Sequence, residues 1–139
     1  MNSGIKTEKQ VERDFFTFIR ESDLGRGIRG TVYRPNMRPA NADTEDLVVK
    51  FLAGLDEQIQ SGVVIINIYV PDIPFGNDGR KVEDITRVDE LEKMIRQFVD
   101  DNDNTEYWMQ TDGTPRSTEV ENIEQHLIYA RIKFNRLAQ

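Results

Sequence analysis

The segment 63–70, which reads VVIINIYV, constrains the fold of this chain more than any other stretch. All of its residues except Asn67 are apolar or aromatic, and most are β-branched, a composition that favours a β-strand. A strand without regular polar alternation is typical of the centre of a sheet. We therefore predict a central strand over 59–72 that has both faces covered and ends at Pro71.

Four other segments have the composition of strands, at 28–35, 47–54, 106–111 and 126–137. In the last of them, apolar residues at the even positions from Ile128 to Phe134 alternate with mostly polar residues at the odd positions. This period of two is the pattern of a strand with one buried face. The segments 73–81 and 112–125 are rich in turn residues and are predicted to be loops.

Two segments, 7–22 and 86–101, carry apolar residues at helical spacing. We predict that Gly25 caps the end of the first helix and that Thr86 caps the start of the second. The resulting order is α-β-β-β-α-β-β. It indicates a single α+β domain over residues 1–139, with two helices on one face of a mainly antiparallel, five-stranded sheet.

Composition excludes several classes of function. The chain has 139 residues and no cysteine, which excludes disulfides, thiolate metal sites and cysteine nucleophiles. No apolar run approaches the roughly 20 residues that span a bilayer, and the first ten residues lack a signal-peptide core. We expect synthesis in a cytoplasm and no membrane partner. The net charge of −7 argues against sequence-specific DNA binding.

The stretch GRGIRGTV at residues 25–32 contains the pattern G-x-G-x-x-G, and Lys50 follows at a distance typical of a kinase lysine. A dinucleotide site needs a strand before the glycines and a helix after them, and the predicted order here is the reverse. A kinase also needs H-R-D and D-F-G, which the chain lacks. We interpret the glycines as a helix end followed by a tight turn. A small nucleotide-binding or kinase-like enzyme using Gly25–Gly30 and Lys50 is kept as the alternative.

No other motif predicts catalysis, a cofactor or a metal. His126 is the single histidine, so a zinc site there would need carboxylates for its other ligands. The acidic segment after Asp100 lacks the glycine and glutamate that an EF-hand loop requires at its sixth and twelfth positions. We expect a structural or binding role, carried by two exposed excursions at 34–46 and 72–84.

The order of elements, together with three stretches of sequence, resembles the tail terminator and tail completion proteins of long-tailed bacteriophages. The stretches are GTVYRPNMRPANADTEDLVVKFLAG, QIQSGVVIINIYVPDI and the closing HLIYARIKF. The similarity extends from about Val11 to Leu137. Small head–tail joining proteins of phages resemble the chain in the same way, through the composition of their strands.

The resemblance implies a structural virion protein, located in the tail and made in the bacterial host cytoplasm. Members of this family assemble as hexameric rings that cap the tail tube and meet the head connector, and DNA passes through without specific binding. Such a ring needs complementary patches on opposite flanks of each subunit. We expect Arg131 and Lys133 to meet the acidic stretch 43–46 of the next subunit. A monomeric adaptor domain is a further alternative.

The residues expected at the interface with other copies, the tube protein or the connector come from both excursions and the last strand. They are Arg34, Asn36, Met37, Arg38, Asp43, Glu45, Asp46, Phe75, Asn77, Asp78, Arg80, Arg131 and Lys133.

Overall fold

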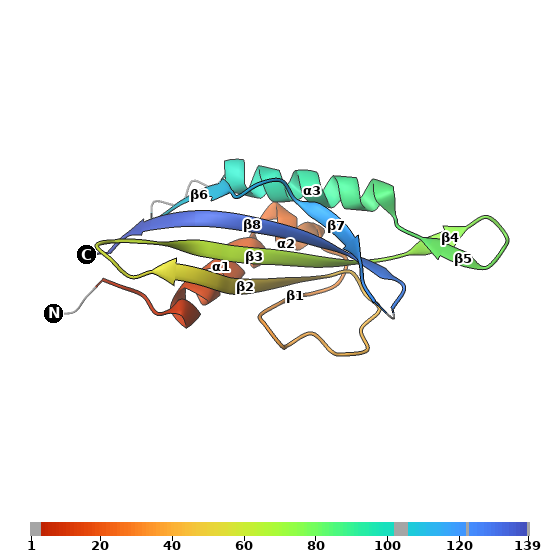
Figure 1. Ribbon diagram of the computed structural model, residues 1–139, viewed down its shortest axis with the longest axis horizontal. Helices are drawn as coiled ribbons and strands as arrows, with labels where there is room; N and C mark the ends of the chain where they lie inside the picture. Colours follow the sequence, from red (N-terminus) through yellow and green to blue (C-terminus); the bar gives the residue numbers. More distant parts are fainter. Residues whose placement is uncertain (1–3, 102–105, 122, 139) are drawn as a thin grey trace.

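The computed structural model describes residues 4–101, 106–121 and 123–138, and consists of one sheet with helices over one of its faces (Figure 1). The helices are α1 (Glu8–Glu21), α2 (Asp23–Gly27) and α3 (Ile85–Asp100). The strands of the main sheet are β1 (Val32–Tyr33), β2 (Asp46–Leu55), β3 (Ile59–Pro71), β6 (Tyr107–Thr111), β7 (Arg116–Glu119) and β8 (Gln125–Leu137). A separate hairpin is formed by β4 (Ile73–Phe75) and β5 (Arg80–Val82).

The α+β class and the mostly antiparallel sheet are confirmed, but the predicted element count is wrong. Within the described residues there are three helices, and the sheet has six strands in the order β1-β2-β3-β8-β6, with β7 also paired to β8. The extra strands β4, β5 and β7 lie in segments predicted to be loops. They are three or four residues long and largely exposed, so none is long enough to show a hydrophobic alternation that could reveal it.

The centre of the fold is the antiparallel pairing of β3 with β8, which extends along all of both strands. On the face toward the helices, Val64, Ile66 and Ile68 lie opposite Ile132, Ala130 and Ile128, and five of these six side chains have no exposed surface. The prediction that β3 has both faces covered is wrong. Val63, Asn67 and Tyr69 on the other face are only partly buried, because no helix packs over them.

The core lies between the sheet and the helices, and aromatic side chains fill one end of it. The rings of Phe15 on α1, Tyr107 on β6 and Phe134 on β8 pack with centroids 5.1 to 5.6 Å apart. These edge-on and tilted contacts are the favoured geometry for aromatic rings. They fix α1 across the strands at this end of the sheet.

Both predicted helix caps are replaced by nearby residues. Ser22 ends α1 and begins α2, since its hydroxyl donates to the Ile19 carbonyl and accepts from the Gly25 N–H. Gly25 is therefore inside α2 rather than at a helix end. The side chain of Asp84, and not Thr86, caps α3 by accepting a hydrogen bond from the Arg87 N–H at 3.1 Å.

The glycines of the G-x-G-x-x-G stretch lie where backbone or side chains approach closely. A Cβ at Gly25 would stand 2.1 Å from the Ile19 carbonyl oxygen, and one at Gly30 would stand 2.2 Å from the Glu45 carbonyl oxygen. A Cβ at Gly27 would meet only the end of the Met94 side chain. Packing alone therefore accounts for Gly25 and Gly30.

This difference in available space predicts unequal losses of stability when Gly25 and Gly27 are replaced by alanine. Gly25→Ala should destabilise the protein by about 2 kcal/mol or more, because the clash is with backbone that cannot yield. Gly27→Ala should cost clearly less, since Met94 can change rotamer. Urea denaturation of the two variants and the wild type measures both losses. Equal losses would contradict this account of the packing.

Candidate functional site

The excursion between β1 and β2 is fixed to the body by a buried ion pair. Two of the three guanidinium nitrogens of Arg87, Nε and Nη2, donate to the two carboxylate oxygens of Glu45 at 2.7 and 2.8 Å, and the Arg29 N–H donates to the same carboxylate. The pKa of Arg87 is raised, chiefly by the hydrogen bond to Glu45. Glu45 is thereby satisfied inside the domain.

The carboxylate of Asp46 is also hydrogen-bonded within the domain. It accepts from the Arg38 Nε at 2.9 Å, the Thr44 hydroxyl at 2.6 Å and the Thr31 N–H at 2.8 Å. The guanidinium of Arg38 also stacks 3.9 Å from the centroid of the Tyr69 ring, so the excursion covers part of the sheet. Arg38 and Asp46 therefore serve to hold the excursion in place.

The other predicted residues of this excursion differ in exposure. Arg34 donates to the buried Glu12 at 3.0 Å. Asn36 has a left-handed backbone with φ of 67°, Met37 is 68% exposed, and Asp43 is exposed. Asn36, Met37 and Asp43 are thus placed for contact with another molecule, whereas Arg34 is engaged within the chain.

The predicted pairing of the last strand with an acidic neighbour must be revised. Glu45 and Asp46 are 4% and 1% exposed, so a second subunit cannot reach them without opening the fold. Arg131 is paired with Asp112 at 3.0 Å. Lys133 is exposed, and in the described parts of the chain it has no carboxylate within ion-pair distance. Of this predicted contact, Lys133 and Asp43 stay accessible.

The second excursion forms a hairpin that projects beyond the body (Figure 1). We call residues 73–82 the arm. Every residue from Ile73 to Lys81 is exposed, including Phe75 at 52%. Arg80 lies 4.8 Å from the centre of the Phe75 ring and pairs with Asp78 at 2.7 Å. The hydrogen bonds from Arg80 lower the pKa of Asp78.

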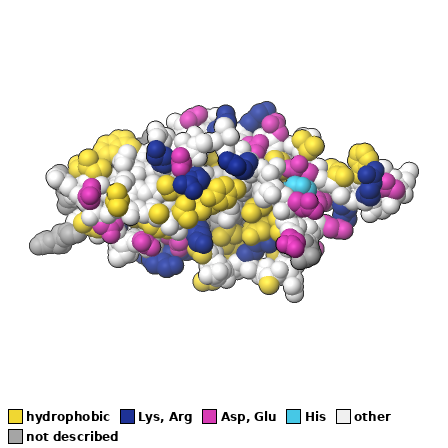
Figure 2. Space-filling view, viewed as in Figure 1, with side chains coloured by type: hydrophobic (Ala, Val, Ile, Leu, Met, Phe, Trp, Pro, Cys, Tyr) yellow, Lys and Arg dark blue, Asp and Glu magenta, His cyan; other side chains and the backbone are white. Residues whose placement is uncertain are grey.

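The face of the sheet away from the helices combines apolar and basic side chains, and we call it the open face. Cross-strand pairing places one row of it as Lys50, Ile65 and Arg131, and the next as Val63, Lys133 and Gln110. Figure 2 shows hydrophobic side chains over the middle of this view with Lys and Arg among them, and most Asp and Glu around them. A protein of net charge −7 thus has a locally basic surface here.

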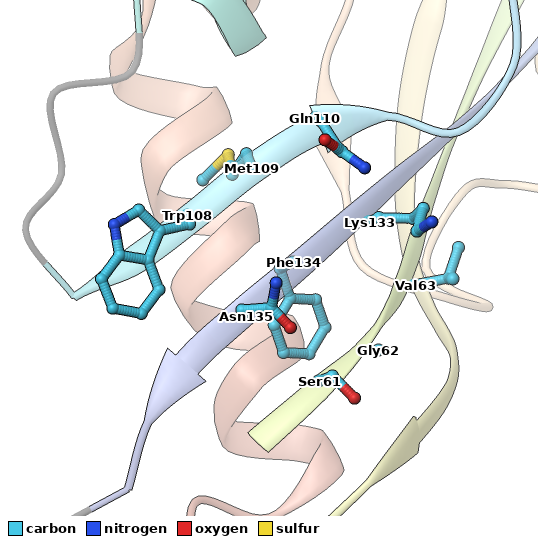
Figure 3. Close-up of a pocket in the computed structure, with 9 residues that line it drawn as sticks. All are labelled: Ser61, Gly62, Val63, Trp108, Met109, Gln110, Lys133, Phe134 and Asn135. Carbon is cyan, nitrogen blue, oxygen red and sulfur yellow. The ribbon is translucent and has the colours of Figure 1, made fainter. Parts of the chain in front are cut away.

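One end of the open face is hollowed (Figure 3). We use "the hollow" for this depression of about 480 Å³, which is lined by Ser61, Gly62, Val63, Trp108, Met109, Gln110, Lys133, Phe134 and Asn135. Trp108 is 60% exposed at its edge. Sequence reasoning found only Lys133 here. Trp108 lies on the same side of its strand as the polar residue Gln110. A tryptophan on the polar side of a strand could have indicated an exposed apolar site.

The glycines and Lys50 do not have the arrangement that a nucleotide site of the kinase type requires. Gly25 and Gly27 lie in α2, Gly30 follows in a turn, and Lys50 lies on β2 at the open face. A kinase glycine loop instead connects two strands. The described residues contain no group of three or more potential metal ligands. His126 contacts Asp72 at 2.7 Å, and the acidic segment after Asp100, which lacks EF-hand spacing, extends into 102–105, outside the described residues.

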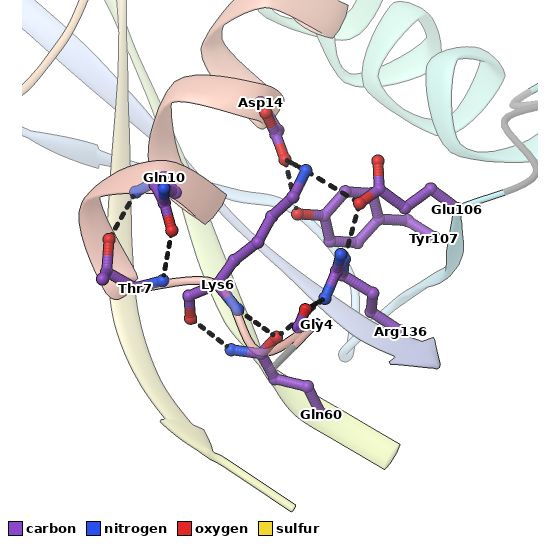
Figure 4. Close-up of polar contacts among 9 residues, drawn as sticks. All are labelled: Gly4, Lys6, Thr7, Gln10, Asp14, Gln60, Glu106, Tyr107 and Arg136. Atoms are coloured by element: carbon purple, nitrogen blue, oxygen red, sulfur yellow. Dashed lines mark hydrogen bonds and ion pairs between the residues drawn. The ribbon is translucent and has the colours of Figure 1, made fainter. Parts of the chain in front are cut away.

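A cluster of ionisable groups fastens the N-terminal segment to the sheet (Figure 4). Lys6 pairs with Asp14 at 2.6 Å and with Glu106 at 2.7 Å, and Glu106 also accepts from Arg136 at 2.6 Å. The Tyr107 hydroxyl donates to Asp14, and burial followed by this bond raises the pKa of Tyr107. Because these groups satisfy one another, the cluster is structural.

No family model matches the chain, and no curated protein matches it. Among the described residues, no helix is both long enough and apolar enough to cross a membrane.

The buried pair between Arg87 and Glu45 predicts a large loss of stability on truncation of one partner. Arg87→Met should lower the free energy of unfolding by about 3–5 kcal/mol, because Glu45 would stay buried without its cation. The double variant Glu45→Gln/Arg87→Met should be more stable than Arg87→Met alone. Urea denaturation of the wild type, the two single variants and the double variant tests this. A loss of stability in the double variant equal to the sum of the two single losses would contradict it.

The pKa of Glu106 predicts a pH dependence with a defined sign. Burial acts to raise it, but hydrogen bonds from Lys6 and Arg136 outweigh burial and lower the pKa below its ordinary value of 4.5. The carboxylate therefore stabilises the fold above about pH 4.5, and this contribution is lost as the pH falls through the lowered pKa. Glu106→Gln should lower the melting temperature at pH 7, and the difference from wild type should shrink on acidification.

Glu92 provides a control of opposite sign. Burial, and then repulsion from Asp89 and Glu83, raise its pKa. A raised carboxyl pKa favours the folded state at low pH, and that advantage is lost as the pH rises through it. Glu92→Gln should therefore raise the melting temperature at pH 7. A fall would contradict the assigned environment.

Proposed function

We propose that this chain is a structural virion protein of a long-tailed phage or prophage, which caps the tail tube as a homo-oligomeric ring and joins it to the head connector. The observation that carries the proposal is the placement of two exposed, partly apolar surfaces at opposite ends of one elongated domain. The arm projects from one end, and the hollow lies toward the other (Figure 1).

Surfaces at opposite ends suit a heterologous contact between identical subunits. Such a contact joins the front of one copy to the back of the next and closes into a ring when the rotation permits. The similarity to tail terminator proteins supports a hexamer. The fixed excursion at 34–46, with Met37 and Asp43 at its surface, is then available to the tube protein or the connector.

The charge of the chain supports the role of a conduit for DNA. The net charge of the subunit is −7, so its overall field repels the phosphate backbone of DNA. Such repulsion favours the passage of DNA through a ring over binding to it. The basic residues of the open face are interleaved with apolar side chains, a mixture that suits a protein partner.

The experiment combines the purified chain with polymerising tail tube protein of the same virus. Negative-stain electron microscopy should show a ring at one end of each tube, and tube lengthening should stop. Light scattering of the chain alone reports whether the ring forms without tubes. Uncapped tubes that continue to lengthen at saturating protein would refute the proposal.

A thermal-shift measurement with ATP and Mg²⁺ tests the enzyme alternative in the same preparation. A specific nucleotide site at 100 times its dissociation constant would add about 2.7 kcal/mol of stability. We expect no shift.

A further inference from the structure

We propose that the free chain forms a two-fold symmetric dimer through one end of its open face, with Glu57 of each copy paired to Lys50 of the other and Trp108 of each copy over the hollow of the other. The partner is thus a second copy of this chain. The inference goes beyond the proposed function and does not rest on it, because it concerns the chain in the absence of tubes.

Exposed apolar side chains gather at the end of the open face where β8 ends. Cross-strand pairing places Leu55 and Trp108 in one row of this face, together with Ser61 and Asn135, and places Ile59 and Leu137 in the row beyond. We call Leu55, Ile59, Trp108 and Leu137 the end patch, and each of them is at least 45% exposed. Large apolar side chains that are grouped and exposed in this way mark an interaction surface.

The charges on the two sides of the end patch have opposite signs. Toward the middle of the sheet lie Lys133 and Lys50, and neither has a carboxylate within ion-pair distance in the described parts of the chain. On the outer side, Glu57 is exposed in the turn between β2 and β3, where no described cation pairs with it. The surface therefore has a basic flank, an apolar centre and an acidic flank.

Such a surface is complementary to a second copy of itself that is turned end to end. Lys50 pairs with Ile65 on one side of the hollow. Glu57 lies on the other side, since it follows the pair of Leu55 with Ser61. A two-fold axis that crosses the strands through the hollow therefore sets Lys50 of each copy against Glu57 of the other. An axis along the strands would instead bring the two basic flanks together.

The axis across the strands also gives Trp108 a place on the partner. Trp108 and Gln110 occupy successive rows of β6 on the open face, and Lys133 lies opposite Gln110 (Figure 3). The indole ring of one copy thus comes to lie against Gln110 and Lys133 of the other, and an ammonium group over an indole ring is a favourable contact. Both lysines that are unpaired within one copy then have a partner in the dimer.

Two charge reversals test this pairing. Lys50→Glu and Glu57→Lys should each weaken dimerisation by about tenfold or more, because each homodimer then contains two like-charge contacts. An equal mixture of the two variants should regain the affinity of the wild type, since both contacts of the mixed dimer join a lysine to a glutamate. Sedimentation equilibrium over a range of protein concentrations measures each dissociation constant.

Trp108 supplies a second readout, since it is the single tryptophan of the chain. Its emission should shift to shorter wavelength and resist acrylamide quenching as the protein concentration rises. Trp108→Ala should weaken dimerisation by about tenfold or more. Two controls lie on α3, outside the open face: Lys93→Glu reverses an exposed lysine and Ile85→Ala truncates an exposed apolar side chain, and both should leave the dimer unaltered.

Several outcomes would overturn the inference. A chain that stays monomeric at its highest soluble concentration has no such contact, and oligomers that continue beyond the dimer indicate a contact that is not two-fold. A dimer that either Trp108→Ala or the charge reversals leave unchanged uses another surface. A mixture of Lys50→Glu with Glu57→Lys that stays monomeric would show that these residues do not pair across the axis.

The results are separable from the test of the proposed function. Capped tubes with a free chain that is monomeric would reject the dimer alone. A dimer that behaves as described, together with tubes that stay uncapped, would support the dimer and reject the terminator role.

Discussion

The pairing of β3 with β8 is the constraint on which the rest of the structure depends. The two strands match along their whole length, so one register places every even-numbered apolar side chain of both strands on the helix face. A shift of β8 by one residue against β3 would turn Ile128, Ile132 and Phe134 away from the core. The same register decides which residues form the open face, because Val63, Ile65 and Lys133 occupy the alternate positions.

Ion pairing decides which charges are left for partners. Two of the acidic residues that the sequence offers most prominently, Glu45 and Asp46, are used to close the fold around Arg87 and Arg38. Their burial is tolerable because each carboxylate is fully hydrogen-bonded. Lys133 has no such partner among the described residues, so the open face is basic although the whole chain is acidic.

The sequence predicted those parts whose signal is local and repetitive. Side-chain periodicity predicted the buried stripe of α1, which contains Val11, Phe15 and Ile19, and the alternation along β8. Both patterns can be recognised in the sequence because each element is buried on one side only. The bare second face of β3 was not predictable. No helix packs on that face, yet Ile65 is only 6% exposed between its cross-strand neighbours Lys50 and Arg131, and Arg38 of the excursion stacks on Tyr69.

By itself, then, the sequence determined an α+β class, a central apolar strand, two main helices and the absence of thiol chemistry. Tertiary structure alone decided that the Glu45 carboxylate is used inside the domain, that Gly25 and Gly30 serve close packing, and that Trp108 and Lys133 border one hollow. The physical reason is distance along the chain. Periodicity reports which side of an element is buried, but partners separated by dozens of residues meet only when the register of the sheet brings them together.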